Sequence, residues 1–329
     1  MAVVTLATAV ILALLITQSN ADCTDLRIVE ILNQPASTAT QFIQLFNSNR
    51  LHAIALNGLT LGHVSGGTSE IMSSDVIIPP LGCALLGSNN GSSNGNVKLD
   101  YPTSTQGTSY IIGDYSLAPT GSNWALSPST WTGSLTNKGS PGVCQQFTLA
   151  ATRAAIITEF APVTSTDIRA RSYVKLFNSA TVSLNLANVN LRDKGSLVNS
   201  FTAAAVLPPM SCSLLSGSSS TTTNGNITGI ASFNSVWWAS SSDMVRLSAT
   251  ITPAEVIGQA VSFVSSTWPS RSAYASYILK DYRQTGDTPS LWRTGSVTWP
   301  GSDDWTDGWS AGSTGYGEPY QCPYVQRES

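Results

Sequence analysis

The sequence has few charged side chains, and they are scattered. Lys and Arg number 16 and Asp and Glu number 19, so charged residues make up 11% of the chain, against about 25% in an average soluble domain. The formal net charge is -3, and no run of Lys and Arg forms a basic stripe. A protein that neutralises the phosphates of nucleic acid needs such a stripe. We therefore expect no nucleic-acid partner.

Residues that carry catalysis are also scarce. The chain has two histidines, His52 and His63, and neither lies beside a nucleophile motif. Paired carboxylates could hydrolyse glycosides without histidine, but Glu30 and Glu159 recur at the same position of a repeated strand, which favours a role in the fold. We therefore expect a non-enzymatic protein with no catalytic residue and no cofactor.

One acidic segment partly resembles a calcium loop. Asp303, Asp304 and Asp307 precede Gly308, and hard cations prefer several oxygen ligands from a tight turn. The later bidentate glutamate of an EF-hand is missing. We favour a solvated turn here and assign no metal ligand.

Long apolar runs are absent except at the start of the chain. Residues 2–17 are apolar and uncharged, and Ser19 and Ala21 supply the small side chains that signal peptidase prefers. We expect a secretory signal peptide over residues 1–21; an uncleaved anchor is the alternative, although a membrane span needs about 20 apolar residues. The sequence thus predicts an extracellular protein, secreted or at the cell surface, without a membrane span.

Four segments occur twice, and the copies lie about 131 positions apart. In the segments that begin at residues 26, 51, 155 and 181, apolar side chains recur at alternate positions, which is the period of a β-strand and predicts an all-β fold. The pairs are "LRIVEILNQP" (26–35) with "AIITEFAPV" (155–163), "FIQLFNSN" (42–49) with "YVKLFNSA" (173–180), "LHAIALNGLTL" (51–61) with "TVSLNLANVNL" (181–191), and "VIIPPLGCALLGS" (76–88) with "AVLPPMSCSLLSG" (205–217).

The packing of a buried strand accounts for the repeated "FIQLF". Phe42, Gln44 and Phe46 point to one side of the strand while Ile43 and Leu45 point to the other. A strand that is apolar on both faces belongs near the middle of a sandwich, and the Asn-Ser that follows makes the turn. The repeat is therefore a signature of the core rather than an active site.

The order of these segments resembles the lamin-tail domain, an immunoglobulin-like β-sandwich that occurs in tandem in many secreted proteins. The matching pieces are "IVEI", "FIQLFN", "LNGLTL", "IPPLG", "SNW" and "GSPG" in the first copy and "ITEF", "YVKLFN", "LANVNL", "LPPMS", "SLW" and "GYGEP" in the second. The copies depart from the family pattern at Gln44, Lys175 and Asn188. The resemblance implies two tandem domains, a shortened one over 22–147 and a second over 148–322, with a tail over 323–329.

The second copy is longer than the first. Cys83 and Cys144 are 61 residues apart, whereas Cys212 and Cys322 are 110 apart. Part of the difference is residues 243–263, which alternate around a Thr-Pro turn and predict a hairpin that completes the second sandwich.

A shortened first sandwich would expose a strand edge, and uncharged edges pair with other chains. We therefore expect self-association through the first copy. The candidate donor strands are residues 22–32 and residues 144–156, the latter being equally consistent with the last strand of the first domain or the first strand of the second.

The five cysteines favour an oxidising compartment. Symmetry favours Cys83 with Cys144 and Cys212 with Cys322; Cys23 with Cys144 is the main rival. Either pairing leaves one thiol over. We expect that thiol to be Cys23, as an interchain bridge or exposed thiol, with a buried unpaired cysteine as the alternative.

Two further features concern the surface. The sequons at Asn90 and Asn226 both lie in the loop after the cysteine-bearing strand, which predicts glycosylation at matched places. Seven of the nine tryptophans lie in the second copy. Exposed, they would stack on glycans or on a partner protein; we favour a place in the core, because large aromatic side chains usually fill interiors.

The sequence therefore predicts a non-enzymatic extracellular structural or adhesion protein that self-associates into a surface fibre or wall layer. The alternative is a secreted glycan-binding module or an accessory module of a secreted hydrolase.

Overall fold

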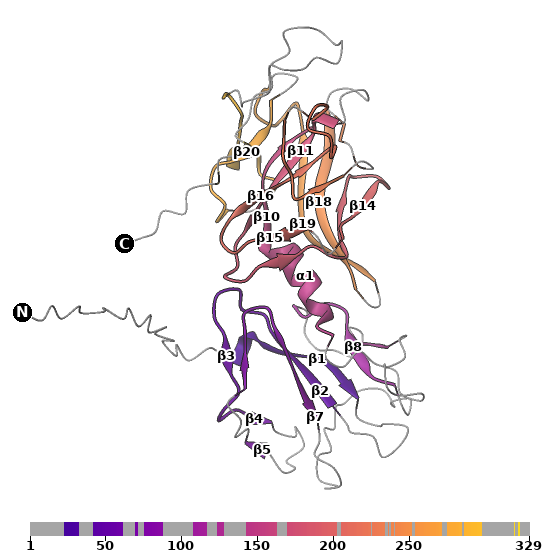
Figure 1. Cartoon of the computed structure of the whole chain (residues 1–329), viewed down its shortest axis with the longest axis vertical. Coiled ribbons are helices and arrows are strands. Elements are labelled where there is room, and N and C mark those ends of the chain that lie inside the picture. The colour runs from indigo at the N-terminus through magenta and orange to yellow at the C-terminus, as the bar shows by residue number, and fades with distance from the viewer. Residues whose placement is uncertain are drawn as a thin grey trace, which may run out of the picture.

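The computed structural model describes residues 23–32, 42–61, 70–71, 76–87, 108–116, 124–127, 143–162, 170–202, 205–224, 226–233, 236, 238–239, 241–251, 254–271, 275–284, 286–297, 319 and 322. These residues form a mostly β structure in several sheets with one α-helix (Figure 1). The all-β fold class is thereby confirmed.

The first copy is built around a five-stranded sheet with the order β7-β2-β1-β8-β9. The short 3-10 turn η1 (Cys23–Asp25) precedes β1. The five strands are β1 (Leu26–Leu32), β2 (Phe42–Asn47), β7 (Cys83–Gly87), β8 (Tyr110–Ile112) and β9 (Trp124–Leu126). Two small ribbons accompany the sheet, β3 (Ile54–Ala55) with β6 (Ile77–Ile78) and β4 (Thr60–Leu61) with β5 (Glu70–Ile71).

The second copy has a six-stranded sheet with the order β17-β16-β11-β10-β20-β21. Its strands are β10 (Ala155–Ala161), β11 (Tyr173–Asn178), β16 (Cys212–Ser216), β17 (Ala231–Ser232), β20 (Tyr277–Leu279) and β21 (Trp292–Thr294), the last after the 3-10 turn η4 (Pro289–Leu291). A ribbon and a four-stranded sheet complete it, with β12 (Leu184–Asn185) on β15 (Val206–Leu207), then β14 (Val198–Ser200), β13 (Val189–Arg192), β18 (Ser242–Thr250) and β19 (Glu255–Val264).

The two main sheets repeat each other strand for strand. β7, β2, β1, β8 and β9 correspond to β16, β11, β10, β20 and β21 in the same order. Both also carry a register shift at the same place, between Ile28 and Glu30 and between Ile157 and Glu159. The sequence repeat is therefore a repeat of strand order and register.

The predicted hairpin over residues 243–263 is confirmed as β18 and β19, which pair antiparallel from Ser242 with Val264 to Thr250 with Glu255. Within the described residues of the first copy nothing corresponds to these two strands or to β17.

Strand β2 lies between β1 and β7, and its six residues are all buried. Ile43 and Leu45 pack in a small cluster with Ile54 and Ile78, whereas Phe46 belongs to a larger cluster that continues into the second copy. The alternation of "FIQLF" between two packed faces is therefore found as predicted.

The extended conformation expected for residues 144–156 is wrong over most of its length. Helix α1 (Gln145–Ala154) occupies it, and β10 begins directly at Ala155. The sequence "QQFTLAATRA" is rich in good helix formers, and Leu149, Ala150 and Ala154 recur at the spacing of one buried helix face. Helix propensity and packing thus outweigh the apparent alternation. In Figure 1 the helix lies between the strands of the first copy and those of the second.

Candidate functional site

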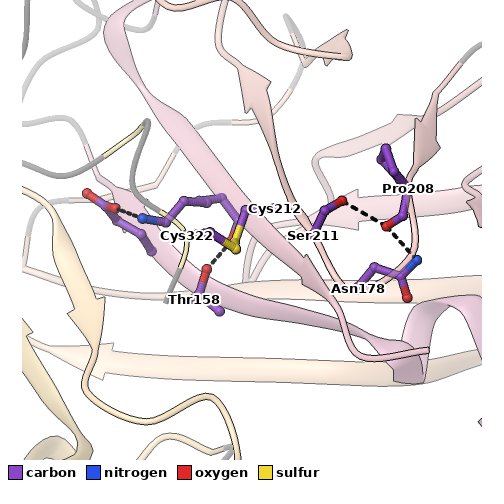
Figure 2. Close-up of a disulfide and its surroundings, with 8 residues drawn as sticks. Thr158, Asn178, Pro208, Ser211, Cys212 and Cys322 are labelled. Atoms are coloured by element: carbon purple, nitrogen blue, oxygen red, sulfur yellow. Dashed lines mark hydrogen bonds and ion pairs between the residues drawn. A yellow bond between two sulfur atoms is a disulfide. The ribbon is translucent and has the colours of Figure 1, made fainter. Parts of the chain in front are cut away.

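The asparagine that ends each "LFN" segment is a buried tie. The Nδ2 group of Asn47 donates to the carbonyls of His52, Ile78 and Pro79 at 2.9, 3.1 and 3.1 Å. Asn178 repeats this with the carbonyls of Val182, Leu207 and Pro208 at 2.9, 3.1 and 2.9 Å. Figure 2 shows Asn178 and Ser211 both reaching the Pro208 carbonyl. The repeated motif is therefore structural, because the asparagine satisfies several buried carbonyls at the strand end.

The structure joins Cys83 to Cys144 and Cys212 to Cys322, the pairs favoured by symmetry. Figure 2 shows the second bridge. In the first copy the bridge brings the start of helix α1 to β7, and the carbonyl of the preceding Val143 accepts a hydrogen bond from Gln44 Nε2 at 2.9 Å. Cys23 lies in η1, directly before β1.

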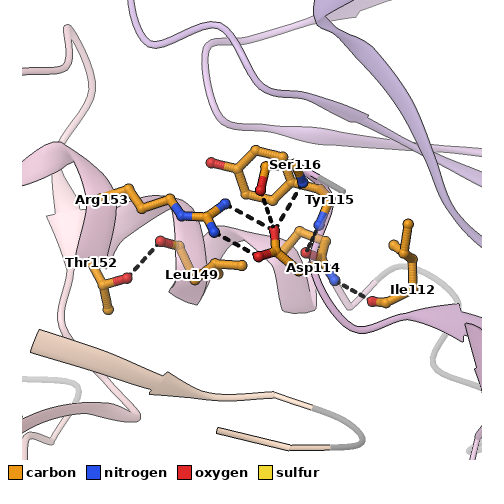
Figure 3. Close-up of polar contacts among 8 residues, drawn as sticks. Ile112, Asp114, Tyr115, Ser116, Leu149, Thr152 and Arg153 are labelled. Carbon is orange, nitrogen blue, oxygen red and sulfur yellow. Dashed lines mark hydrogen bonds and ion pairs between the residues drawn. The ribbon is translucent and has the colours of Figure 1, made fainter. Parts of the chain in front are cut away.

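Helix α1, which runs directly into β10 of the second copy, is bonded to the end of β8 in the first copy. We call the contacts of Gln146 and Arg153 with residues 112–115 the clamp. Gln146 Nε2 donates to the Ile112 carbonyl at 2.7 Å, and its Oε1 accepts from the Tyr115 amide at 3.3 Å. Arg153 donates both Nη groups to the Asp114 carboxylate at 3.0 and 2.7 Å (Figure 3). Its guanidinium also lies 5.1 Å from the centre of the Tyr115 ring. The residues after β8 are thereby held to the helix by charge, hydrogen bonds and a cation–π contact.

The contact between Asp114 and Arg153 shifts the pKa values of both groups in the direction that favours their charged forms. Burial raises the pKa of Asp114, but the hydrogen bonds from Arg153 and Ser116 outweigh it, so the pKa lies below its ordinary value of 3.8. Burial lowers the pKa of Arg153, and the hydrogen bonds to Asp114 and Tyr115 reverse this and raise it. Both groups are therefore charged at neutral pH.

The second copy uses the same residues differently. Asp281 and Tyr282 correspond to Asp114 and Tyr115, and the Phe177 and Tyr282 ring centres lie 4.6 Å apart, as the Phe46 and Tyr115 centres lie 4.8 Å apart. Asp281 pairs with the nearby Arg283 at 3.2 Å, and this pair is much more exposed to solvent than the pair in the clamp. In the second copy the aspartate therefore pairs with an arginine two residues away, whereas Asp114 of the first copy pairs with Arg153 on helix α1.

The first copy presents an open strand edge. β7 is the outermost strand of its sheet, and no strand in the described part of the chain pairs with its outer side. Leu85 on β7 is 46% exposed. Its counterpart Leu214 on β16 is 5% exposed, and β17 pairs in parallel with that edge. Among the described residues the two equivalent strands therefore differ, because β16 has a strand on its outer side and β7 has none.

The donor strands expected from the sequence are already bonded within the chain. β1 pairs with β2 on one side and β8 on the other, and β10 pairs with β11 and β20. The pairing with β8 covers Glu30 and Ile31, and the pairing with β20 covers Glu159 and Phe160, while residues 145–154 are helical. The expectation of a donor strand is therefore wrong for residues 145–154, and residues 26–32 and 155–156 are already bonded to β2 and β11 in the sheets of their own chain.

The repeated glutamates are buried among hydroxyl groups. Glu30 accepts from Ser109 Oγ at 2.6 Å, and Glu159 accepts from Ser276 Oγ at 2.6 Å. Glu159 also lies 2.6 Å from the Nζ of Lys175, a pair in which both side chains are almost fully buried. A buried charged group needs such partners. The burial of both Glu30 and Glu159 agrees with the expectation that these recurring glutamates have a role in the fold. The ion pair of the second copy was not foreseen.

Several surface expectations can be placed. Trp238, Trp268 and Trp292 are buried, so they offer no stacking surface for glycans. Asn226 is exposed, at a positive φ of 61°, in a loop that Asn224 ties to Ser218 and Ile227. His52 is exposed.

Other predicted features lie outside the described residues: Asn90, His63, the aspartates at 303, 304 and 307, and the tryptophans at 237, 299, 305 and 309. Within the described residues no group of three or more His, Cys, Asp or Glu side chains could hold a metal ion. In that same part of the chain, no helix has the length and apolar character that crossing a membrane requires. Searches found no protein-family model and no curated protein that matches the chain.

Proposed function

We propose that this chain is a non-enzymatic extracellular structural protein that self-associates through the outer edge of β7. Its two copies are, in this proposal, tandem immunoglobulin-like sandwiches similar to lamin-tail domains. The observation that carries the proposal is a double contrast: among the described residues β7 has no strand on its outer side and its Leu85 is 46% exposed, whereas β16 is paired by β17 and its Leu214 is 5% exposed in a cluster with Ala161, Tyr173 and Ile227. Two strands in equivalent places differ in whether an edge is covered.

The chemistry of β7 suits strand addition. Its sequence "CALLG" has no charge and no proline, the two features that most often protect an edge from pairing. The partner we propose is the β7 edge of a second protein molecule, because β1 and β10 already pair within the sheets of their own chain and residues 145–154 are helical. An isologous antiparallel contact would join main-chain groups and bury Leu85 of both chains.

An extracellular site of action has three supports. The two disulfides are typical of oxidising compartments. The N-terminal residues have the composition of a secretory signal. The sequon at Asn226 is exposed in a tied loop, where an attached glycan would meet solvent. Cys23 would add an interchain bridge beside the first strand.

The test compares two edges of one sheet. Leu85 on β7 and Leu126 on β9 are 46% and 44% exposed, and each lies on an outermost strand. We expect the mature protein to form dimers or larger species by size-exclusion chromatography with light scattering. Leu85→Lys should shift it to monomer, and Leu126→Lys should leave association intact.

A reductant arm separates association through the edge from a bridge through Cys23. A wild type that stays monomeric at high concentration, or association that survives Leu85→Lys in reductant, would remove the proposed interface. Loss of association in both variants would show that general surface apolarity, not β7, is responsible.

A further inference from the structure

The second copy holds a lysine and a glutamate in a geometry suited to reaction. Glu159 on β10 and Lys175 on β11 are directly opposite each other in the antiparallel pair. The Nζ atom lies 2.6 Å from Glu159 Oε2, and the side chains are 2% and 0% exposed. The amine and the carboxyl group are therefore fixed against each other away from bulk solvent.

The other carboxylate oxygen is surrounded by donors. The Tyr173 hydroxyl and the Ser276 hydroxyl, the latter at 2.6 Å, both donate to Glu159 Oε1. Tyr173 and Ser276 are themselves fully buried. Hydroxyl donors aimed at one oxygen stabilise negative charge that develops there during acyl transfer. The four side chains thus supply a nucleophile, a carboxyl carbon and an oxyanion-stabilising pair.

The first copy has only half of this set. Its Glu30 is buried and accepts from Ser109, but Gln44 stands in the place of Lys175. Phe42 stands in the place of Tyr173. The equivalent position therefore keeps the carboxylate and one hydroxyl, and lacks the amine and the second hydroxyl.

We propose that Lys175 and Glu159 join in an intramolecular amide cross-link between β10 and β11. The ammonium group of Lys175 first passes one proton to Glu159 Oε2, 2.6 Å away. The neutral amine then attacks the carboxyl carbon of Glu159, and Tyr173 and Ser276 stabilise the charge that develops on Oε1. The new N–C bond forms as the C–Oε2 bond breaks. Of the three protons of the ammonium group, two leave with Oε2 as water and one remains on the amide nitrogen. No oxidant, reductant or further reactant is required.

Burial favours the products. The reactants are two charges held in a site from which water is almost excluded, and their desolvation is costly even when they are paired. The cross-link replaces them with one neutral amide, which the Tyr173 and Ser276 hydroxyls can still hydrogen-bond. The inference concerns the interior of the second copy, so it does not depend on association through β7.

The test is the intact mass of the mature protein, made in an oxidising host, then reduced and denatured. We expect it to be lighter than the sequence by one water molecule. Trypsin should then give residues 154–169 joined to residues 172–192, without cleavage after Lys175. An unmodified mass would overturn the proposal, as would a water loss that maps to other residues.

Two variants identify the groups responsible. Lys175→Gln installs the side chain that the first copy has at this place, and it should restore the full mass. Tyr173→Phe removes one donor to Oε1 and should lower the cross-linked fraction after a fixed time. A water loss that persists in Lys175→Gln would contradict the cross-link, and an unchanged fraction in Tyr173→Phe would remove the assigned role of that hydroxyl.

Discussion

The two copies share a sheet but complete their cores differently. In the described residues the second copy covers its sheet with its own hairpin, β18 and β19, whereas the first copy has only short ribbons. Several of its buried residues belong instead to the large cluster that includes helix α1 and the second copy: Val29, Phe46, Leu81, Ile112 and Tyr115. The sheet of the second copy is therefore stabilised by its own second layer, whereas the sheet of the first copy packs partly against helix α1 and the second copy.

The largest difference in unfolding free energy between the copies should come from the residues opposite Glu30 and Glu159, which are Gln44 and Lys175. Lys175→Met leaves Glu159 buried without the amine that it meets, whether that contact is the ion pair or the proposed amide, and an uncompensated buried carboxylate of this kind costs about 3–5 kcal/mol of unfolding free energy. Gln44→Met at the equivalent position removes the neutral hydrogen bond to Val143 and should cost about 1 kcal/mol. Urea unfolding followed by tryptophan fluorescence measures both. Similar costs in the two copies would contradict the comparison.

The next effect tests how closely the helix packs on the hairpin of the second copy. A Cβ atom at Gly258 would lie 1.9 Å from Thr152 Oγ1 and 2.4 Å from Thr152 Cβ. Gly258→Ala must therefore displace helix α1 or β19, at a cost of about 1–3 kcal/mol. Gly195→Ala is the control, because its nearest contact is a side-chain oxygen at 3.1 Å, and we expect a change within about 0.5 kcal/mol. Equal melting temperatures for the two variants would show that helix α1 can move away from β19 without a measurable loss of stability.

The clamp and its local counterpart form a matched pair of salt bridges. Arg153→Ala removes a bidentate, partly buried contact with Asp114 and should cost about 1–2 kcal/mol after allowance for solvent screening. Arg283→Ala removes the exposed contact with Asp281, and we expect no measurable change in thermal denaturation. A larger loss in the second variant would reverse the assignment of the clamp.

The same clamp predicts a pH dependence. Because the pKa of Asp114 is lower in the folded state, its contribution is full at pH values above the ordinary pKa of 3.8 and is lost as the pH falls through the lower folded value. The stability gap between wild type and Arg153→Ala should therefore narrow on acidification. Unfolding free energies at pH 7 and at successive acidic pH values test this; a constant gap would show that the pair is not linked to the titration of Asp114.

The smallest effect concerns a turn that the copies build with different residues. Gly58 has φ 81° and its counterpart Asn188 has φ 63°, so both adopt the left-handed conformation that Gly and Asn tolerate best. Gly58→Asn should cost less than about 1 kcal/mol, and Gly58→Val about 1–2 kcal/mol because a β-branched side chain is disfavoured there. Equal melting temperatures for Gly58→Asn and Gly58→Val would show that residue 58 does not keep the left-handed conformation.

Sequence patterns were sufficient for strands with strong alternation. The paired faces of β2, the hairpin of β18 and β19, and the symmetric disulfides all follow from period-2 spacing and from the position of Cys83 and Cys212 within a repeat. The sequence does not predict helix α1, because "FTLAATRAAI" has an accidental alternation, whereas the helix buries an Ala-rich face where it contacts β18 and β19.

The buried cluster and the clamp were beyond the reach of local patterns. Lys175 stands in a strand sequence that gives no sign of its partner, since the register of β10 on β11 places Glu159 opposite it. Arg153 and Asp114 are 39 residues apart and meet only because the helix returns across the end of β8. Both arrangements depend on long-range pairing, and no spacing along the chain encodes it.

The disulfides limit how far the chain can be extended by force. A chain pulled from its ends can lengthen only outside the loops that they close, which span 61 and 110 residues. At about 3.4 Å of extension per residue, the bridges withhold about 200 Å and about 370 Å of length. Force applied after local unfolding would therefore pass through sulfur rather than through β8, β9 and the hairpin of β18 and β19, which would remain folded or recoil without having been stretched.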